Sequence, residues 1–234
     1  MAYQIFVRNL SRSAQYFYVF QKQATFQPPV TAVSILSSSL GCENVSTYES
    51  SGAQIMFGLD TQIYAGAIST MAPTPPSQAK MSFSLKANLS RSSATMAARA
   101  IALTTTAGNT LNSTVLSLNP LDLSASSTQP GIPVGAFAIN VPTYTPTSPP
   151  KLYCGVAARN DDGTFILSSF IAPMPNAVLS CATKQVFFVK VGYQPVGNLL
   201  PYDESNAARC DFSSGFATII VNYNQDGTFS TQGS

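Results

Sequence analysis

The sequence contains no histidine and no tryptophan, and only 9% of its 234 residues are charged. Without histidine the chain cannot form a Ser-His-Asp or Cys-His nucleophilic unit, nor an imidazole metal site. Lys plus Arg number 12 and Asp plus Glu number 10, and the resulting net charge of +2 predicts no binding to nucleic acid. Chemistry based on carboxylates, lysine or tyrosine stays open, but the composition favours a protein that is not an enzyme.

The chain also lacks a long apolar run, and we expect no secretory leader. Residues 1–9 have no positively charged start, no continuous apolar segment and no small-residue cleavage site. Because no run of about 18 apolar residues occurs, we expect no transmembrane segment. These features predict a cytoplasmic protein. The sequence does not determine the state of its cysteines, which form no Cys-X-X-Cys pair and are interpreted as buried thiols: Cys42, Cys154, Cys181 and Cys210.

The most prominent stretch that is present is Tyr16 to Phe20, with the sequence Tyr-Phe-Tyr-Val-Phe. Such residues favour a strand that is covered on both faces, or that lines an aromatic cavity with one face. Tyr16, Tyr18 and Phe20 would share one face, and the two residues between them the other. We expect this strand at the centre of a sheet whose other aromatic strands are residues 187–193 and 216–223.

Alternating apolar and polar residues predict many short strands. Turn-forming residues at 9–13 predict a hairpin between strands at 3–7 and 16–20. Asp162-Gly163 predicts a second hairpin, between residues 152–158 and 164–171. The alanine-rich segment 92–103, in which Ser92 or Ser93 could be the cap, predicts one short helix. Further strands are expected at residues 30–40, 54–59, 62–68, 80–89, 116–118, 134–141, 186–193 and 216–223.

Stretches rich in proline, serine and threonine separate these elements, at residues 71–78, 123–133 and 142–150. We interpret residues 71–78 as a loop or a sheet edge. We interpret the other two stretches as long surface loops, because strand-like residues resume directly after residues 123–133. A chain of about 200 to 250 residues is typical of one β-sandwich or barrel. We therefore predict an all-β fold: a single antiparallel β-sandwich domain over residues 1–234, with long Pro/Ser/Thr-rich loops and at most one or two short helices.

Two groups of side chains are candidates for binding. Tyrosines at the ends of aromatic strands favour a pocket that is apolar in its body and polar at points, although ordinary core packing explains them equally well. The segment Tyr202-Asp203-Glu204, with Arg209 nearby, is the densest polar cluster and could also be a solvated loop. No catalytic residue is predicted, and a metal stays open. The predicted ligand contacts are Tyr16, Tyr18, Phe188, Lys190, Tyr202 and Arg209.

Four segments resemble a family of basidiomycete β-sandwich proteins that includes the pink chromoprotein of the salmon-coloured oyster mushroom. They are Tyr3-Gln-Ile-Phe-Val-Arg-Asn-Leu-Ser, Gln15-Tyr-Phe-Tyr-Val-Phe-Gln-Lys-Gln, Leu152-Tyr-Cys-Gly and Phe188-Val-Lys-Val-Gly. The resemblance implies an antiparallel β-fold that carries a small conjugated organic chromophore without turnover. It supplies no ligand-contact motif that could be transferred to numbered residues.

The predicted function is therefore that of a non-catalytic pigment-binding protein, with a small conjugated organic chromophore held non-covalently in an aromatic pocket. A cation bound beside the chromophore stays open. The expected partner is this small-molecule ligand, and a homodimer is left open. Two alternatives come from other classes: a fungal cytosolic carbohydrate-binding lectin, and a membrane-active, cytolysin-like defence protein. An enzyme that uses only carboxylates is the weakest alternative.

Overall fold

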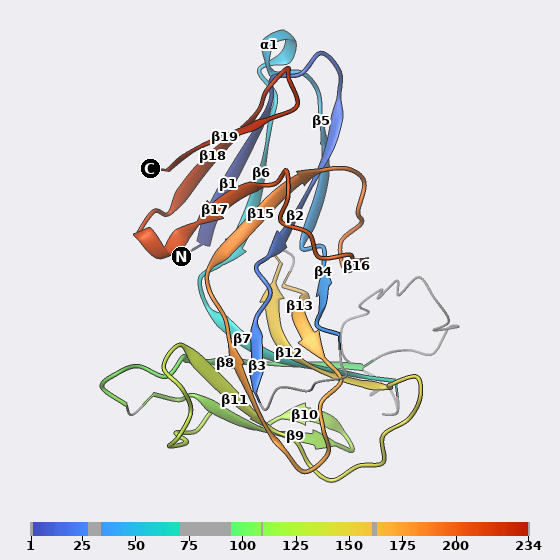
Figure 1. Cartoon of the computed structure of the whole chain (residues 1–234), viewed down its shortest axis with the longest axis vertical. Coiled ribbons are helices and arrows are strands. Elements are labelled where there is room, and N and C mark those ends of the chain that lie inside the picture. Colours follow the sequence, from blue (N-terminus) through green and yellow to red (C-terminus); the bar gives the residue numbers. More distant parts are fainter. Residues whose placement is uncertain (1, 28–33, 71–94, 109, 161–162, 234) are drawn as a thin grey trace.

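The described part of the chain forms four β-sheets, arranged in two face-to-face pairs, in the computed structural model (Figure 1). The structure describes residues 2–27, 34–70, 95–108, 110–160 and 163–233. In that part of the chain the non-strand elements are one α-helix, α1 (Tyr48–Ser51), and one 3-10 turn, η1 (Phe212–Ser214). The predicted all-β fold with at most one or two short helices is confirmed.

The upper pair of sheets in Figure 1, here called the upper sandwich, encloses one hydrophobic core. Its two sheets contribute inward side chains such as Val7, Phe17 and Val189, none of which is exposed. Burying a side chain of this size stabilises the fold by about 1.5–3 kcal/mol. One sheet has the spatial order β19 (Phe229–Gly233), β18 (Thr218–Tyr223), β1 (Ala2–Asn9) and β6 (Gln54–Asp60). The other has the order β17 (Ala208–Asp211), β15 (Val186–Val191), β2 (Gln15–Gln21) and β5 (Gly41–Val45).

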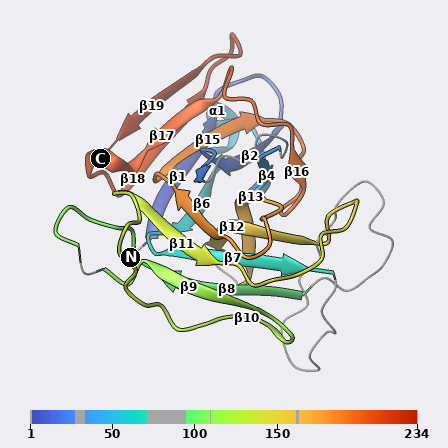
Figure 2. The same ribbon diagram turned by 60° about the horizontal axis from the view of Figure 1, so that its bottom comes forward.

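The lower pair, here called the lower sandwich, encloses a second core around Phe137, Ile139 and Leu123. Figure 2 brings this pair forward. Its five-stranded sheet has the order β10 (Leu121–Leu123), β9 (Ser113–Leu118), β11 (Ala136–Asn140), β14 (Val178–Ala182) and β3 (Thr25–Gln27). Its six-stranded sheet has the order β16 (Leu199–Leu200), β4 (Leu36–Ser38), β13 (Phe165–Ile171), β12 (Leu152–Arg159), β7 (Ile63–Ser69) and β8 (Thr95–Ile101).

The chain passes from the upper to the lower sandwich where β2 leads to β3 and where β6 leads to β7 (Figure 1). A buried polar contact lies at this junction. Ser168 on β13 donates a hydrogen bond of 2.7 Å to Oε1 of Gln21, and the amide nitrogen of Gln21 donates to Lys184 O and Thr183 Oγ1. Because a buried polar group without a partner is costly, this contact fixes how β2 meets β13. The single-domain organisation over residues 1–234 stays a prediction.

The predicted hairpin of the two N-terminal strands is wrong. β1 pairs in parallel with β18 and antiparallel with β6, whereas β2 pairs with β15 and β5 in the facing sheet. The reason lies in Asn9, which is buried and whose side chain binds Ser13 O at 2.8 Å and Val45 O at 3.2 Å. Its Oδ1 also accepts from the amide and hydroxyl of Ser11. The polar segment is therefore an arch between two sheets and not a turn within one.

The predicted helix at residues 92–103 is also wrong, because residues 95–101 form β8. This strand pairs with β7 along its whole length, and Ala97 lies opposite Ala67. Ala97, Ala67 and Ile101 all belong to the lower core. Alanine has a high helix propensity, but here its small side chain lets two strands pack under a second sheet, and this tertiary contact outweighs the propensity.

Other differences concern boundaries and short strands. The described part of the predicted strand at 30–40 contains only β4, and Gly41 begins β5 where a stop was expected. The segment 216–223 supplies β18, which lies in the sheet facing β2 and not in the same one. The predicted strand at 80–89 lies outside the described residues. The second predicted hairpin is confirmed by the antiparallel pair β12 and β13. The sequence prediction missed β3, β5, β10, β14, β16, β17 and β19.

Candidate ligand-binding surfaces

Aromatic side chains gather on the outward surface of the sheet that contains β2 and β15. We call this surface the aromatic face and define it by Tyr16, Tyr18, Phe20, Phe188, Tyr193 and Tyr202. The alternation of β2 produces it: Phe17 and Val19 point into the upper core, so their neighbours point outward. The predicted division of this strand into two faces is therefore correct.

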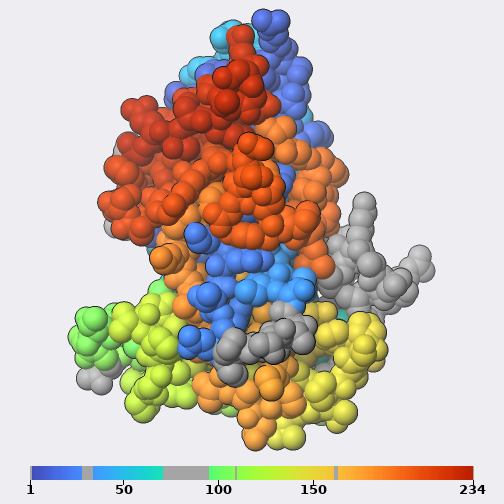
Figure 3. All heavy atoms as spheres, in the orientation of Figure 1, coloured from blue at the N-terminus to red at the C-terminus, as the bar shows by residue number. Residues whose placement is uncertain are grey.

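The inner half of the aromatic face is closed by its own rings. Phe20 and Phe188 are 2% and 3% exposed, and their ring centroids lie 5.4 Å apart in a stacked arrangement. Tyr18 stacks on Phe20 at 5.8 Å, and Tyr202 approaches Phe20 edge-on at the same distance. In Figure 3 the orange residues near position 200 lie over the blue N-terminal strands, where they cover this half. Aromatic pairs of this geometry each contribute about 0.5–1.5 kcal/mol beyond their burial.

The outer half is open to solvent. Tyr16 is 43% exposed and Tyr193 66% exposed, and their rings meet edge to face at 5.0 Å. Tyr18 lies between this pair and the buried rings, and Gly192 passes close to its ring. Solvent exposure therefore decreases along the aromatic face, from two exposed tyrosines, through the half-buried Tyr18, to the buried cluster around Phe20.

Charged groups around the aromatic face are already paired. Lys190 Nζ lies 2.5 Å from Asp203 Oδ2 and also donates to Asp203 O at 3.2 Å. Hydrogen bonds from Lys190 and Ser205 hold the pKa of the Asp203 carboxyl well below its usual range. The Tyr202 hydroxyl donates to Glu204 and accepts from the Gln23 amide at 3.2 Å. These contacts fasten the segment around Tyr202 to the sheet.

Burial raises the pKa of two tyrosine hydroxyls on the aromatic face. It raises the pKa of Tyr202 to about 12, with a further contribution from the hydrogen bond to Glu204. Burial also raises the pKa of Tyr18, and the negative charge of Asp203 adds to this effect. Both hydroxyls therefore keep their protons at neutral pH and can donate hydrogen bonds.

The structure brings four of the six predicted contact residues together: Tyr18, Phe188, Lys190 and Tyr202. Lys190 lies directly opposite Tyr18 in the pairing of β15 with β2. Tyr16 lies at the open end of the same surface. Arg209 is opposite Phe188 on β17, but its guanidinium binds Asp211 at 2.6 Å.

Sequence reasoning left Phe20 and Tyr193 out of the predicted contacts, although both belong to the aromatic face. The alternation of residues 16–20 already placed Phe20 on the right side of its strand. The predicted strand ran to Tyr193, and its alternation put Tyr193 on the inward side with Phe187 and Val189. β15 ends at Val191, so the alternation does not extend to Tyr193, whose ring lies on the outward side against Tyr16.

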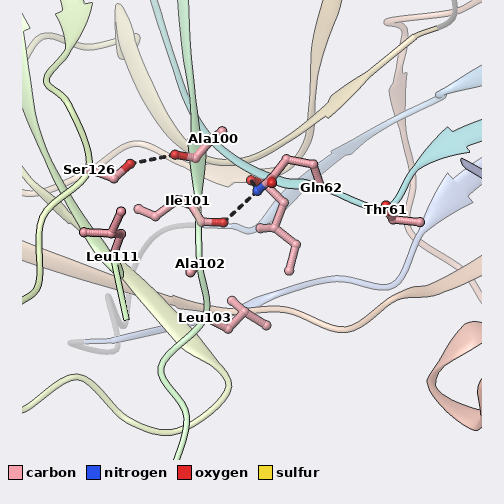
Figure 4. A pocket seen from close by; sticks show the side chains of 9 residues that line it. Thr61, Gln62, Ala100, Ile101, Ala102, Leu103, Leu111 and Ser126 are labelled. Atoms are coloured by element: carbon pink, nitrogen blue, oxygen red, sulfur yellow. Dashed lines mark hydrogen bonds between the residues drawn. The ribbon is translucent and has the colours of Figure 1, made fainter. Parts of the chain in front are cut away.

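A second candidate surface lies on the lower sandwich, at the end of β8, and we call it the lower groove (Figure 4). It has a volume of about 420 Å³. Gln62 Nε2 donates to Ile101 O at 2.9 Å, and Ser126 Oγ donates to Ala100 O at 2.6 Å. The remaining lining residues are mostly apolar: Thr61, Ile63, Ala102, Leu103 and Leu111. Nothing in the sequence patterning pointed to this groove, because its residues come from four separate segments.

Metal and thiol chemistry have little support in the described residues. They contain no group of three or more His, Cys, Asp or Glu side chains placed to hold a metal ion. All four cysteines are free thiols, and Cys154, Cys181 and Cys210 are buried whereas Cys42 is half-buried. Burial raises the pKa of the Cys210 thiol to about 12, which keeps it protonated and unreactive.

One structural finding and three comparisons with known proteins bear on the wider setting of these surfaces. No helix in the described part of the chain is long and apolar enough to cross a membrane. Searches of protein-family models, curated proteins and solved structures found no match to this chain. The resemblance to basidiomycete chromoproteins therefore stays a prediction from the sequence.

Proposed function

We propose that the protein is a non-catalytic chromoprotein that holds a small, flat, conjugated organic molecule at the open end of its aromatic face. The observation that carries this proposal is the pair Tyr16 and Tyr193. Two large aromatic side chains stay 43% and 66% exposed, in edge-to-face contact, beside a surface that is otherwise closed. An exposed aromatic pair of this kind offers a flat ligand a ring to stack on and a second ring to contact edge-on.

The polar surroundings favour stacking and hydrogen bonding over charge pairing. Lys190 is neutralised by Asp203 and Arg209 by Asp211, so neither supplies an unpaired cation. Tyr18 is half-buried next to the exposed pair, and its hydroxyl is held in the protonated form. A carbonyl or ring oxygen of a conjugated ligand that lay along Tyr16 could accept a hydrogen bond from Tyr18.

The first test is the colour of the protein itself. Protein purified from its natural source should absorb at wavelengths longer than tyrosine does, and native mass spectrometry should show a non-covalent adduct. Colourless protein without an adduct would refute the proposal.

The second test locates the chromophore. Tyr16→Ala and Tyr193→Ala should each weaken its retention about two- to tenfold, the range for losing one aromatic contact. Tyr18→Ala should lower ligand binding more than it lowers stability. The matched control is Tyr48→Ala, which removes a tyrosine that lies on α1 beneath the Arg8 guanidinium, outside the aromatic face. Equal effects of all four substitutions would show that the chromophore is bound elsewhere.

A carbohydrate-binding lectin is the second candidate function, and the same exposed pair favours it. The apolar face of a sugar ring can lie on an exposed tyrosine, and the exposed side chain of Asn44, directly opposite Tyr16 on β5, can bind hydroxyl groups. A glycan array probed with colourless recombinant protein separates the two: specific glycan binding that Tyr16→Ala abolishes supports the lectin, and a blank array removes it.

A further inference from the structure

The lower groove has the size and lining of a second small-molecule site, distinct from the aromatic face. Its volume of about 420 Å³ falls within the range of roughly 300–1,000 Å³ that is usual for ligand pockets. Ile101 is buried at its base as part of the lower core, and Leu111 is 55% exposed at its edge. An occupant would therefore rest on apolar carbon that belongs to the core of the sandwich.

The edge of the sheet at this point is closed to a further strand. β8 is the last strand of the six-stranded sheet, and such an edge could in principle pair with a peptide. However, the Ala100 carbonyl already accepts from Ser126, and the Ala102 amide already donates to Leu111 O at 2.9 Å. A peptide would have to break these bonds, so the occupant that fits is a small molecule.

The lining also restricts the charge of the occupant. None of the described residues that line the groove is ionisable: the polar ones are Thr61, Gln62 and Ser126. A charged ligand would lose hydration on entering and would meet no opposite charge there. A neutral ligand loses much less.

Two of the polar side chains at the groove, Gln62 and Ser126, are left as acceptors. Both hydrogens of the Gln62 amide are donated, to Ile63 O at 2.7 Å and to Ile101 O at 2.9 Å. The single hydrogen of the Ser126 hydroxyl is donated to Ala100 O. What these two side chains can still offer is the oxygen Oε1 of Gln62 and the lone pairs of Ser126 Oγ. Figure 4 shows the two side chains approaching β8 from opposite sides.

We propose that the lower groove binds a neutral, largely apolar small molecule that carries a hydroxyl or N–H donor at one edge. The apolar base supplies the contact area, and one of the two oxygens, Oε1 of Gln62 or Oγ of Ser126, accepts the donated hydrogen. This site does not depend on the chromophore site proposed above.

Three probes that share the naphthalene ring system test the preference for a neutral hydrogen-bond donor. At pH 7, 2-naphthol is neutral and a donor, 2-methoxynaphthalene is neutral without a donor, and 2-naphthoate is an anion. Binding is followed by probe fluorescence on a Tyr16→Ala/Tyr193→Ala background, which removes the open tyrosines. We expect 2-naphthol to bind about five- to tenfold more tightly than the methyl ether, the value of one hydrogen bond, and 2-naphthoate not to bind measurably.

Two exposed apolar residues supply a matched pair of variants that locate the probe. Leu111→Ser should weaken 2-naphthol binding severalfold, whereas Val134→Ser, at a site 63% exposed and outside the groove, should leave it unchanged. Circular dichroism establishes that both variants are folded. Equal affinity for the three probes, binding that Leu111→Ser does not alter, or binding that is lost on the double-tyrosine background would each overturn the proposal.

Discussion

Replacing Phe20 with alanine should lower the free energy of unfolding by about 3–5 kcal/mol, the usual cost of deleting a buried phenylalanine ring. Phe20 is 2% exposed, although it lies on the outward surface of its sheet and not in either sandwich core. Its ring contacts three others, Tyr18, Phe188 and Tyr202, at centroid distances of 5.4 to 5.8 Å. The cavity left by alanine could not collapse easily, because Lys190 and Asp203 hold the covering segment in place.

Tyr16→Ala is the matched comparison, since Tyr16 is on the same strand and the same face. Because its ring is 43% exposed and contacts only one other described ring, Tyr193, the loss should be about 1 kcal/mol. Urea unfolding of wild type and both variants, followed by far-ultraviolet circular dichroism, gives the two differences, and unchanged m-values would establish comparable unfolded states. If Phe20→Ala costs no more than Tyr16→Ala, the inner half of the aromatic face is not packed as described.

Three further predictions concern an exposed carboxylate, a buried hydroxyl and a close backbone approach. The pKa of Asp203 is lowered in the folded state, so its contribution to stability is present above the ordinary Asp value of about 4 and is lost as the pH falls below it. The urea midpoints of wild type and Asp203→Asn should therefore differ at pH 7 and converge in acid; a constant difference would contradict this. Ser168→Ala leaves buried Oε1 of Gln21 without its donor and should lower the unfolding free energy by about 1–3 kcal/mol, whereas a neutral result would show that the contact is not needed. A β-carbon at Gly155 would lie 2.2 Å from Ser169 O, so Gly155→Ala should cost about 3 kcal/mol in the same assay. Gly52→Ala is the comparison: a β-carbon there would meet nothing within 4 Å, and only the left-handed φ of 65° disfavours alanine, so the unfolding free energy should fall by about 1 kcal/mol. Equal losses for the two variants would show that the close contact at Gly155 is not what destabilises Gly155→Ala.

The pattern of apolar and polar residues predicted strands correctly where successive side chains of a segment point to opposite faces of one sheet. Residues 16–20 show this most clearly: alternation alone assigned Phe17 and Val19 to one side and the tyrosines to the other, and both sides are as predicted. The Asp162-Gly163 turn likewise predicted the pair β12 and β13, because a hairpin is a contact between neighbours in sequence.

Contacts between distant segments could not be predicted in this way. β1 pairs with β6 and with β18, and β18 is more than 200 residues away. The local signal for a turn after Asn9 gave no hint that the buried Asn9 amide would bind Val45 O across the sandwich. The same limitation explains the missed short strands, since β16 consists only of Leu199 and Leu200 and exists because β4 offers it an edge.

The sequence by itself determined the fold class. Because it contains no histidine, it also excluded every catalytic unit and metal site that needs an imidazole. It also placed the tyrosines of β2 on one surface, because a strand alternates its side chains wherever it is built. Only the tertiary structure decided which rings on that surface are covered and which stay open. Exposure depends on what packs above a strand: the segment with Tyr202 closes over Phe20 and leaves Tyr16 and Tyr193 exposed to solvent.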